Sequence, residues 1–489
     1  MICDINLSDS IMKRLLFSLS SLLLAAVMVV GCDQVALDEP EPQQSIQSER
    51  VFTTQEGFEA TLNAAYDRLE SFTRYGQYYQ LYPDALSDNI DFIQGANRYN
   101  DIVRNIEDEH LETYNNPYDA INLTNNVITK IRGLDLEAEN PTAVKDRIKG
   151  EAHFLRALNY FDLVRTFAYE PGRESGNFTQ GVVLRTQPTE TVDDADFRPR
   201  ASNQEVYDQV VADLDSAAVL LEGKAQTRSR ANVAAAYGLL ARAHLYLENW
   251  AEAEAAATEA INRAGAVDAS LVEQDAYASA WNAASYSGSL FELHMTEGQD
   301  GDATNTNESL TSLTSLDPTG ATTFNFQVIP SQDVLSLFAD DDVRSSLIQQ
   351  TPGGVTFFAK YGNTRGAFTD RVPIVRVAEM YLIRAEARVE QDNASGARED
   401  LNTLRTTRGL SEVGGPDSGL IDSIMVERRR ELLYEGHRWY DLKRRGMDVP
   451  KPQPTVTEDE IPYSDFRILA PLPDAEVRSS PELEQNPGY

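Results

Sequence analysis

The side chains that most often carry catalysis or bind metals are scattered thinly along this chain of 489 residues. None of the five histidines has the spacing of a zinc-ligand set. They are His110, His153, His244, His294 and His437. The sequence also lacks the H-E-x-x-H, G-x-S-x-G, P-loop and Rossmann glycine patterns of common active sites. We therefore expect no catalytic residues, no metal site and no cofactor.

Carboxylates are too numerous, at 77, for spacing to single out a catalytic pair. The separation of two carboxyl groups, which distinguishes glycosidase mechanisms, cannot be obtained from sequence. The densest run of acids and bases has opposite charges three, four and seven residues apart, as along one helix. It could form a site, but we favour an ion network that holds the last helices together, with Gly436 between two of them. The run comprises Glu427, Arg428, Arg430, Glu431, Glu435, Arg438 and Asp441.

Two stretches combine aromatic rings with Asn and Asp, the combination that binds sugars through ring faces and hydroxyl groups. The first contains Tyr75, Tyr78, Tyr79, Tyr82, Asp84, Asp88 and Asn89. The second contains Tyr277, Trp281, Asn282 and Tyr286. We predict ligand contacts for both, with Trp281 the best single candidate because no helical pattern explains it. The alternative is that these aromatic residues pack the first helix onto the rest of the fold.

The N-terminus has the pattern of a secreted lipoprotein. A short basic stretch at Met12-Lys13-Arg14 precedes a 16-residue apolar run from Leu15 to Val30, which suits a secretory signal. Val29-Val30-Gly31-Cys32 then resembles a lipobox, in which the cysteine is lipidated. We predict a signal peptide over 1–31, with Met12 as a candidate true start. Residues 32–50, acidic and proline-bearing, are predicted to form a tether after lipidation at Cys32.

Charge and cysteine content narrow the class of protein further. A net charge of −34 repels phosphate backbones and argues against a nucleic-acid partner. Only 8 of the 43 basic residues are lysine, which suits a high-salt habitat or reflects compositional drift. Both cysteines lie near the N-terminus, so the body of the chain has no disulfide framework.

Helical periodicity dominates the rest of the chain, and its clearest case is a hairpin over 231–264. Apolar residues recur every three or four positions on both sides of a short turn at Glu248-Asn249-Trp250. The second half is a row of alanines, so the two backbones can approach closely. The hairpin resembles a tetratricopeptide repeat, with His244 in place of the usual tyrosine. The matching positions are Leu240, Ala241, Trp250, Ala253 and Ala260.

Other helix pairs are predicted at 114–133 with 145–166, at 203–222 leading into 231–247, and at 373–408. Repeats of this kind bury a core only by stacking, so we expect about four helix pairs. Two regions break the helical pattern. Residues 167–202 are predicted to form a long loop. Residues 265–372 are predicted to form an irregular, ligand-binding insertion with short strands at Ser289 to His294 and Val355 to Tyr361.

Several blocks resemble the SusD/RagB family, in the order the family has them. They are GEAHFLRALNYFDLVRTF (150–167), RANVAAAYGLLARAHLYLENW (230–250), VPIVRVAEMYLIRAEARVEQ (372–391), LNTLRTTRGL (401–410), ERRRELLYEGHRWYDLKRRG (427–446) and the terminal QNPGY (485–489). The resemblance covers most of 54–489. It implies an all-α fold of tetratricopeptide-like helical repeats, forming one domain over 51–489 with its repeat helices mainly at 114–264 and 373–446.

The same resemblance implies a function. It predicts a non-catalytic lipoprotein, anchored in the outer membrane and facing the cell exterior. Such a protein captures an oligosaccharide or another nutrient for a TonB-dependent, SusC-like transporter. Two alternatives stay open from the sequence. One is a structural tetratricopeptide-type scaffold of the envelope, which predicts no ligand pocket in 265–372. The other is a lipoprotein glycan hydrolase, which predicts a buried carboxylate pair with perturbed pKa values in a cleft.

Overall fold

Most of the chain after residue 50 is described by a computed structural model. The described residues are 51–93, 98–106, 109–190, 197–224, 227–296, 304–305, 307–316, 325–452, 456, 458 and 460–489. The predicted signal peptide, Cys32 and tether therefore lie outside the described residues. Within the described part, no helix is both long enough and apolar enough to cross a bilayer.

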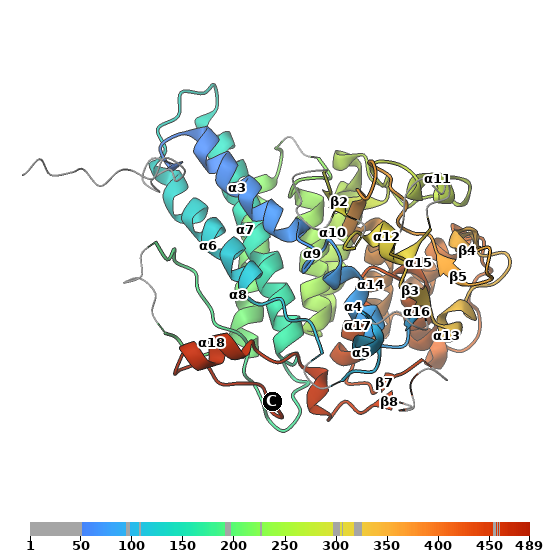
Figure 1. The fold of residues 1–489 in the computed structure, drawn as a ribbon. Helices are drawn as coiled ribbons and strands as arrows, with labels where there is room; N and C mark the ends of the chain where they lie inside the picture. Colours follow the sequence, from blue (N-terminus) through green and yellow to red (C-terminus); the bar gives the residue numbers. More distant parts are fainter. Residues whose placement is uncertain are drawn as a thin grey trace, which may run out of the picture. The chain divides into compact units, whose positions relative to one another are not determined.

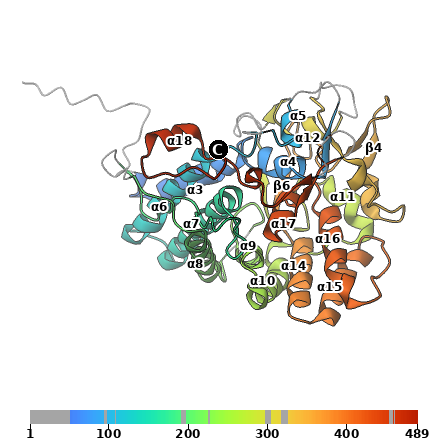
Figure 2. The same cartoon turned by 90° about the horizontal axis from the view of Figure 1, so that it is seen from below.

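Helices dominate the structure, which confirms the predicted all-α fold class (Figure 1). Neighbouring helices in the stack pack against one another in the order α3, α6, α7, α8, α9, α10, α14 and α15, a succession that Figure 2 shows from another side. Their bounds are α3 Gln55–Glu70, α6 Asn115–Lys130, α7 Pro141–Phe167, α8 Asn203–Leu221, α9 Val233–Tyr246, α10 Trp250–Arg263, α14 Val377–Glu390 and α15 Ala394–Thr406. The predicted helix pairs all appear in this stack.

Local sequence explains where several of these helices begin. Asn140 caps α7 by accepting a hydrogen bond from the Ala143 amide, and Pro141 occupies the first turn, where no amide donor is needed. Ser202 and Glu205 form a reciprocal capping box at the start of α8. These caps satisfy amide groups that have no partner within the helix, so they fix the start of each helix in the stack.

The predicted close approach of α9 and α10 is confirmed by the burial of its alanines. Ala243, Ala253, Ala257 and Ala260 are fully buried. On α9, Gly238 lies so close to β6 (Arg371–Arg376) that an added Cβ would lie 2.5 Å from Val375 Cγ1. Small residues thus let two layers pack directly onto this helix.

Between α10 and α14 the chain leaves the stack for a long excursion and then returns, because α14 packs against α10. The excursion holds short elements: α11 Tyr277–Trp281, β2 Ser289–His294, α12 Leu310–Thr314, β3 Val328–Pro330, α13 Gln332–Leu335, β4 Ile348–Gln350, β5 Thr356–Phe358 and β6. The predicted strand at Ser289 to His294 is confirmed as β2. The second predicted strand is shorter than expected, since β5 covers only Thr356–Phe358.

The strands form antiparallel pairs, some of them local and others between segments far apart in the sequence. β2 pairs with β6, β4 with β5, and β1 (Ile90–Phe92) with β3. The remaining elements are α4 Tyr78–Ala85, α5 Asn100–Val103, α16 Leu420–Glu431, α17 Arg438–Arg444, β7 Val449–Pro450, β8 Glu460–Ile461 and α18 Asp474–Ser479. The pairing of β1 with β3 anchors the excursion to the segment that contains the first set of predicted ligand residues.

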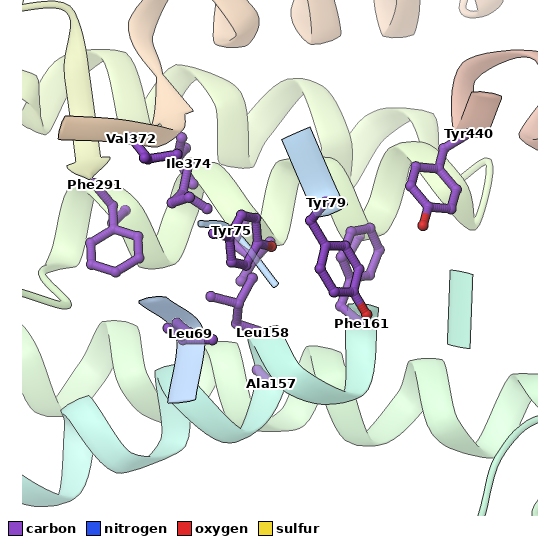
Figure 3. Packing of buried hydrophobic residues seen from close by; sticks show 14 of the residues in the cluster. Leu69, Tyr75, Tyr79, Ala157, Leu158, Phe161, Phe291, Val372, Ile374 and Tyr440 are labelled. Carbon is purple, nitrogen blue, oxygen red and sulfur yellow. The ribbon is translucent and has the colours of Figure 1, made fainter. Parts of the chain in front are cut away.

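The main core lies where α7 meets the segment after α3. Figure 3 shows Leu158 and Phe161 of α7 facing Tyr75 and Tyr79, with Ile374 of β6 beside them. A separate, smaller apolar cluster joins α14, α15 and α16, as the periodicity of 373–408 predicts. The first aromatic stretch therefore contributes directly to the main core.

Candidate functional site

The tyrosines of the first predicted stretch differ in their access to solvent. Tyr75 and Tyr79 are buried and stacked, with ring centroids 5.4 Å apart. The Tyr75 hydroxyl donates to Asp162 Oδ1 at 2.9 Å, and Arg74 pairs with the other oxygen of the same carboxylate at 3.0 Å. Tyr78 is only half-buried. It stacks on the buried Tyr82 with centroids 4.1 Å apart, so Tyr78 is the member of this stretch with an accessible ring.

The acidic and amide residues of the same stretch bind the C-terminal helices. Asp88 accepts from Arg438 Nε at 2.8 Å, and Asn89 accepts from Arg429 Nε at 2.7 Å. Asp84 accepts hydrogen bonds from the Asn89 side chain at 2.9 Å and from the backbone amide of Tyr434 at 2.6 Å. Burial raises the pKa of Asp84 to about 7. These contacts support the packing alternative for Asp84, Asp88 and Asn89.

The second predicted stretch surrounds a buried indole. Trp281 is 1% exposed and stacks on Tyr286, with ring centroids 4.4 Å apart. Three cations lie over its ring: Lys360 at 4.7 Å, Arg371 at 5.1 Å and Arg376 at 5.6 Å. Cations held at these distances are attracted to the ring face. The arrangement gives Trp281 a packing role, and ligand contact by this residue remains a prediction.

The other members of the second stretch also differ in their exposure to solvent. Tyr277 and Tyr286 are buried, whereas Asn282 is exposed and donates to the backbone oxygen of Ala278 at 3.0 Å. None of these residues lines the four hollows that lie beside α3, α6, α15 and Tyr78. The structure thus brings Tyr277, Trp281 and Tyr286 together, but as part of the interior.

The charged run at 427–441 forms the ion network that the sequence favours. Glu431 lies between Arg344, Arg376 and Arg408, at 3.0, 2.9 and 2.9 Å, and all four side chains are buried. These cations hold the pKa of the Glu431 carboxyl well below its usual range, against the opposing effect of burial. Most partners come from other elements, which periodicity along one helix cannot show.

Gly436 lies in the connection after α16, which already ends at Glu431. Its φ of +72° falls in the left-handed region, and an added Cβ would lie 1.7 Å from the backbone oxygen of Tyr79. The glycine is therefore needed for a close approach to α4. Gly436 lies between α16 and α17, as predicted, although α16 already ends at Glu431.

A hollow of about 650 Å³ opens beside Tyr78. Its walls come from the segment after α3, from the start of α6 and from the chain just before α18. The lining residues are Thr73, Tyr78, Glu112, Thr113, Tyr114, Asn115, Asn116, Pro471, Leu472, Pro473 and Asp474. We call it the Tyr78 hollow. One of the residues predicted from sequence, Tyr78, thus lies at an accessible concave surface.

The chemistry of the Tyr78 hollow suits a polyhydroxylated ligand. It offers aromatic and proline surfaces for apolar faces, with amides, hydroxyls and carboxylates for hydrogen bonds. Asp474 forms an exposed pair with Arg478 at 3.4 Å. Sequence reasoning missed the lining at 112–116 and 471–474, because these segments have no shared pattern and lie far apart along the chain.

The four hollows named above can be compared with the titratable groups of the described residues. Asp84, whose pKa is raised, is buried in the core and lines none of them. Among the described residues, no group of three or more His, Cys, Asp or Glu side chains could hold a metal ion.

Family models match both halves of the chain. Residues 353–489 match the model described as the SusD family, and residues 37–247 match one described as "Starch-binding associating with outer membrane". The chain belongs to the SusD family. Two SusD-like proteins of Formosa agariphila, P38 and P2, are each 26% identical to it. The alignments cover 96% and 94% of this chain and 99% and 97% of those proteins.

Solved structures of SusD superfamily proteins share the fold. One from Bacteroides thetaiotaomicron has a TM-score of 0.77 at 26% identity, and its match covers 89% of this chain and 100% of the other. Another, from Bacteroides vulgatus, has a TM-score of 0.77 at 25% identity and covers 89% of this chain and 99% of its own. The resemblance inferred from the sequence blocks is therefore confirmed over nearly the whole chain.

Proposed function

We propose that this SusD-family protein is a non-catalytic receptor that captures an oligosaccharide at the outer membrane. It then delivers the sugar to a TonB-dependent, SusC-like transporter. The description of the family model for residues 37–247, starch binding with outer-membrane association, supports this class of ligand and this location. Lipidation of Cys32, with residues 32–50 as a tether, would hold the receptor at the membrane facing the cell exterior.

The Tyr78 hollow is the observation that carries the ligand assignment. Tyr78 presents a half-buried ring supported from below by Tyr82, so the ring is held in place before a ligand arrives. A fixed ring loses little conformational entropy on binding, which favours affinity. Asn115, Asn116 and Glu112 supply hydrogen-bonding groups along the same wall.

The two alternatives make different predictions for this hollow. A scaffold that only joins envelope proteins predicts no oligosaccharide binding at all. A glycan hydrolase predicts release of shorter products, and it needs a carboxylic acid of raised pKa at the cleft. Asp84 is the carboxyl group in which burial raises the pKa to about 7, and it lies in the core instead.

The test is binding of neutral and acidic oligosaccharides by isothermal titration calorimetry, with chromatography of the sugar afterwards. We expect binding without cleavage, and Tyr78→Ala should weaken it by about tenfold, or about 1.4 kcal/mol. Tyr381→Ala is the matched control, because Tyr381 is also half-buried but lies on α14, outside the hollow. Unchanged affinity in a folded Tyr78→Ala variant would reject this site, and shortened sugar would favour the hydrolase.

A further inference from the structure

A second hollow lies directly beside the first. It has a volume of about 310 Å³ and is bounded by α6, by the chain at 183–189 and 197–198, and by the region of α18. Two residues, Tyr114 and Asn115, line both hollows. The two cavities are therefore neighbours separated by one wall at the start of α6.

Tyr114, in the shared wall, is fixed by contacts with the core. Tyr114 is 4% exposed, and its ring meets the edge of Phe167 at a centroid distance of 5.2 Å. The ring also contacts Tyr118, with centroids 4.9 Å apart. Because Tyr114 is buried and held by two aromatic contacts, the wall between the two hollows is part of the core and not a loose side chain.

The opposite wall of the second hollow is fixed by side chains of α6. Asn122 makes two hydrogen bonds to the backbone of Thr189, donating to its oxygen at 2.9 Å and accepting from its amide at 2.8 Å. Asn125 donates to the backbone oxygens of Arg185 and Gln187, at 3.1 Å each. The chain at 185–189 is thus held along the helix, and this part of the hollow is formed before any ligand binds.

An exposed aromatic ring marks the rim of this hollow. Phe197 lines it and is 62% exposed, whereas the other large hydrophobic side chains exposed in the described residues are aliphatic. They are Ile106, Val219, Val426 and Met447. An apolar ring left in water at the edge of a concave surface is a feature of ligand sites, and its face matches the apolar face of a sugar ring.

We infer that the second hollow is a binding subsite, and that the two hollows together take a single oligosaccharide extending across Tyr114. The inference rests on the proposed function and adds a length requirement to it. Sugar units at Phe197 are linked to those already held at Tyr78, so their binding is intramolecular and adds to affinity through effective concentration. The preferred ligand is consequently an oligosaccharide longer than either hollow alone can hold.

The experiment measures affinity along one oligosaccharide series, from the disaccharide upward, for the full chain and two variants. In the wild type we expect affinity to rise with length and then level off. Phe197→Ala should leave affinity for the shortest ligand unaffected and lower affinity for the long members by about tenfold, so that affinity no longer rises with length. Val219→Ala is the matched control, because Val219 is 77% exposed on α8 and lines neither hollow.

The outcomes separate the two proposals. If Tyr78→Ala weakens binding but Phe197→Ala binds long oligosaccharides as the wild type does, the second subsite is rejected and the receptor function stands. Affinity independent of length rejects it as well. If the wild type binds no oligosaccharide of any length, both proposals fail. Both substituted residues are partly or largely exposed, and thermal unfolding of each variant shows whether the fold is intact.

Discussion

Arg376 and Glu435 form a buried, two-point ion pair, with Arg376 Nε 2.6 Å from Oε2 and Nη2 2.8 Å from Oε1. Arg376 is the last residue of β6 and directly precedes α14, while Glu435 lies in the connection between α16 and α17. Lys360 donates to the same carboxylate at 2.5 Å. This pair therefore joins the excursion, the repeat stack and the C-terminal helices at one point.

Breaking this pair is expected to destabilise the fold strongly. Arg376→Met removes a positive charge that balances the buried carboxylates of Glu431 and Glu435. The free energy of unfolding should fall by about 3–5 kcal/mol. Urea-induced unfolding measures this change. The control is Arg478→Met, since Arg478 and Asp474 are exposed and such pairs contribute at most about 1 kcal/mol. Equal effects of the two substitutions would contradict the role given to the network.

Overpacking the seam between α9 and α10 is expected to lower stability. Ala243 is fully buried against neighbouring helices, so Ala243→Trp forces them apart and costs roughly 1–3 kcal/mol. Differential scanning calorimetry should show a lower Tm. Ala255→Trp on the exposed face of α10 provides the comparison and should leave the Tm nearly unchanged. An unaltered Tm for Ala243→Trp would show that the seam has spare volume.

The sequence predicts those features that depend on local patterns. The alanine row at 253–264 identifies both a helix and its close-packed face, because a period of 3.6 residues places small side chains on one side. The strand β2 follows from a short apolar run bounded by polar residues. The charged run at 427–441 identifies an ion network because its charges recur at helical spacing.

Features that depend on several distant segments could not be predicted. The Tyr78 hollow needs the chain at 73–78, 112–116 and 471–474 together, and no periodicity links these segments. Trp281 has no helical position to fill, so sequence favoured ligand contact for it. The structure instead surrounds it with Tyr286 and three cations from later in the chain. Burial among distant residues leaves no local signal.

The raised pKa of Asp84 predicts an unusual pH dependence of stability. Burial raises this pKa from 3.8 to about 7, so between these values the folded state binds a proton that the unfolded state has lost. The contribution of Asp84 to stability therefore falls as the pH rises from about 4 to about 7. At about 1.4 kcal/mol per pKa unit, the loss is on the order of 4 kcal/mol.

Asp84→Asn isolates this contribution, because the amide does not titrate. As the pH rises through this range, the unfolding free energy of the wild type should fall relative to that of the variant. Urea unfolding at several pH values measures it, with Asp67→Asn as an exposed control. A difference that is constant with pH, or that grows with it, would show that Asp84 is ionised throughout.

Membrane attachment is predicted to depend on Cys32. Lipidation adds acyl chains whose burial in the bilayer anchors the protein, and residue 32 offers the thiol that the lipobox pattern requires. Cys32→Ser should move the protein from the membrane to the soluble fraction of cells, as measured by fractionation and immunoblotting. Cys3→Ser lies in the predicted leader and should have no such effect. Membrane retention of Cys32→Ser would contradict lipid anchoring at this position.

Substitution of Trp281 tests whether this residue packs in the core or contacts the ligand. Its indole is 1% exposed, stacked on Tyr286 and flanked by Lys360, Arg371 and Arg376. Truncation to alanine removes a large buried ring, so Trp281→Ala should lower the unfolding free energy by about 3–5 kcal/mol.

Ligand contact by Trp281 predicts a different result: weaker oligosaccharide binding, by about 2 kcal/mol, with the fold intact. Trp281→Phe keeps an aromatic ring in the core and so separates the two roles. If Trp281 only packs, this variant should lose less stability than Trp281→Ala and should bind oligosaccharide with wild-type affinity. Calorimetry of unfolding and of binding on both variants provides the measurement. Loss of affinity in a Trp281→Phe variant with wild-type stability would show that the indole reaches the ligand, which would require the region around Tyr286 to open on binding.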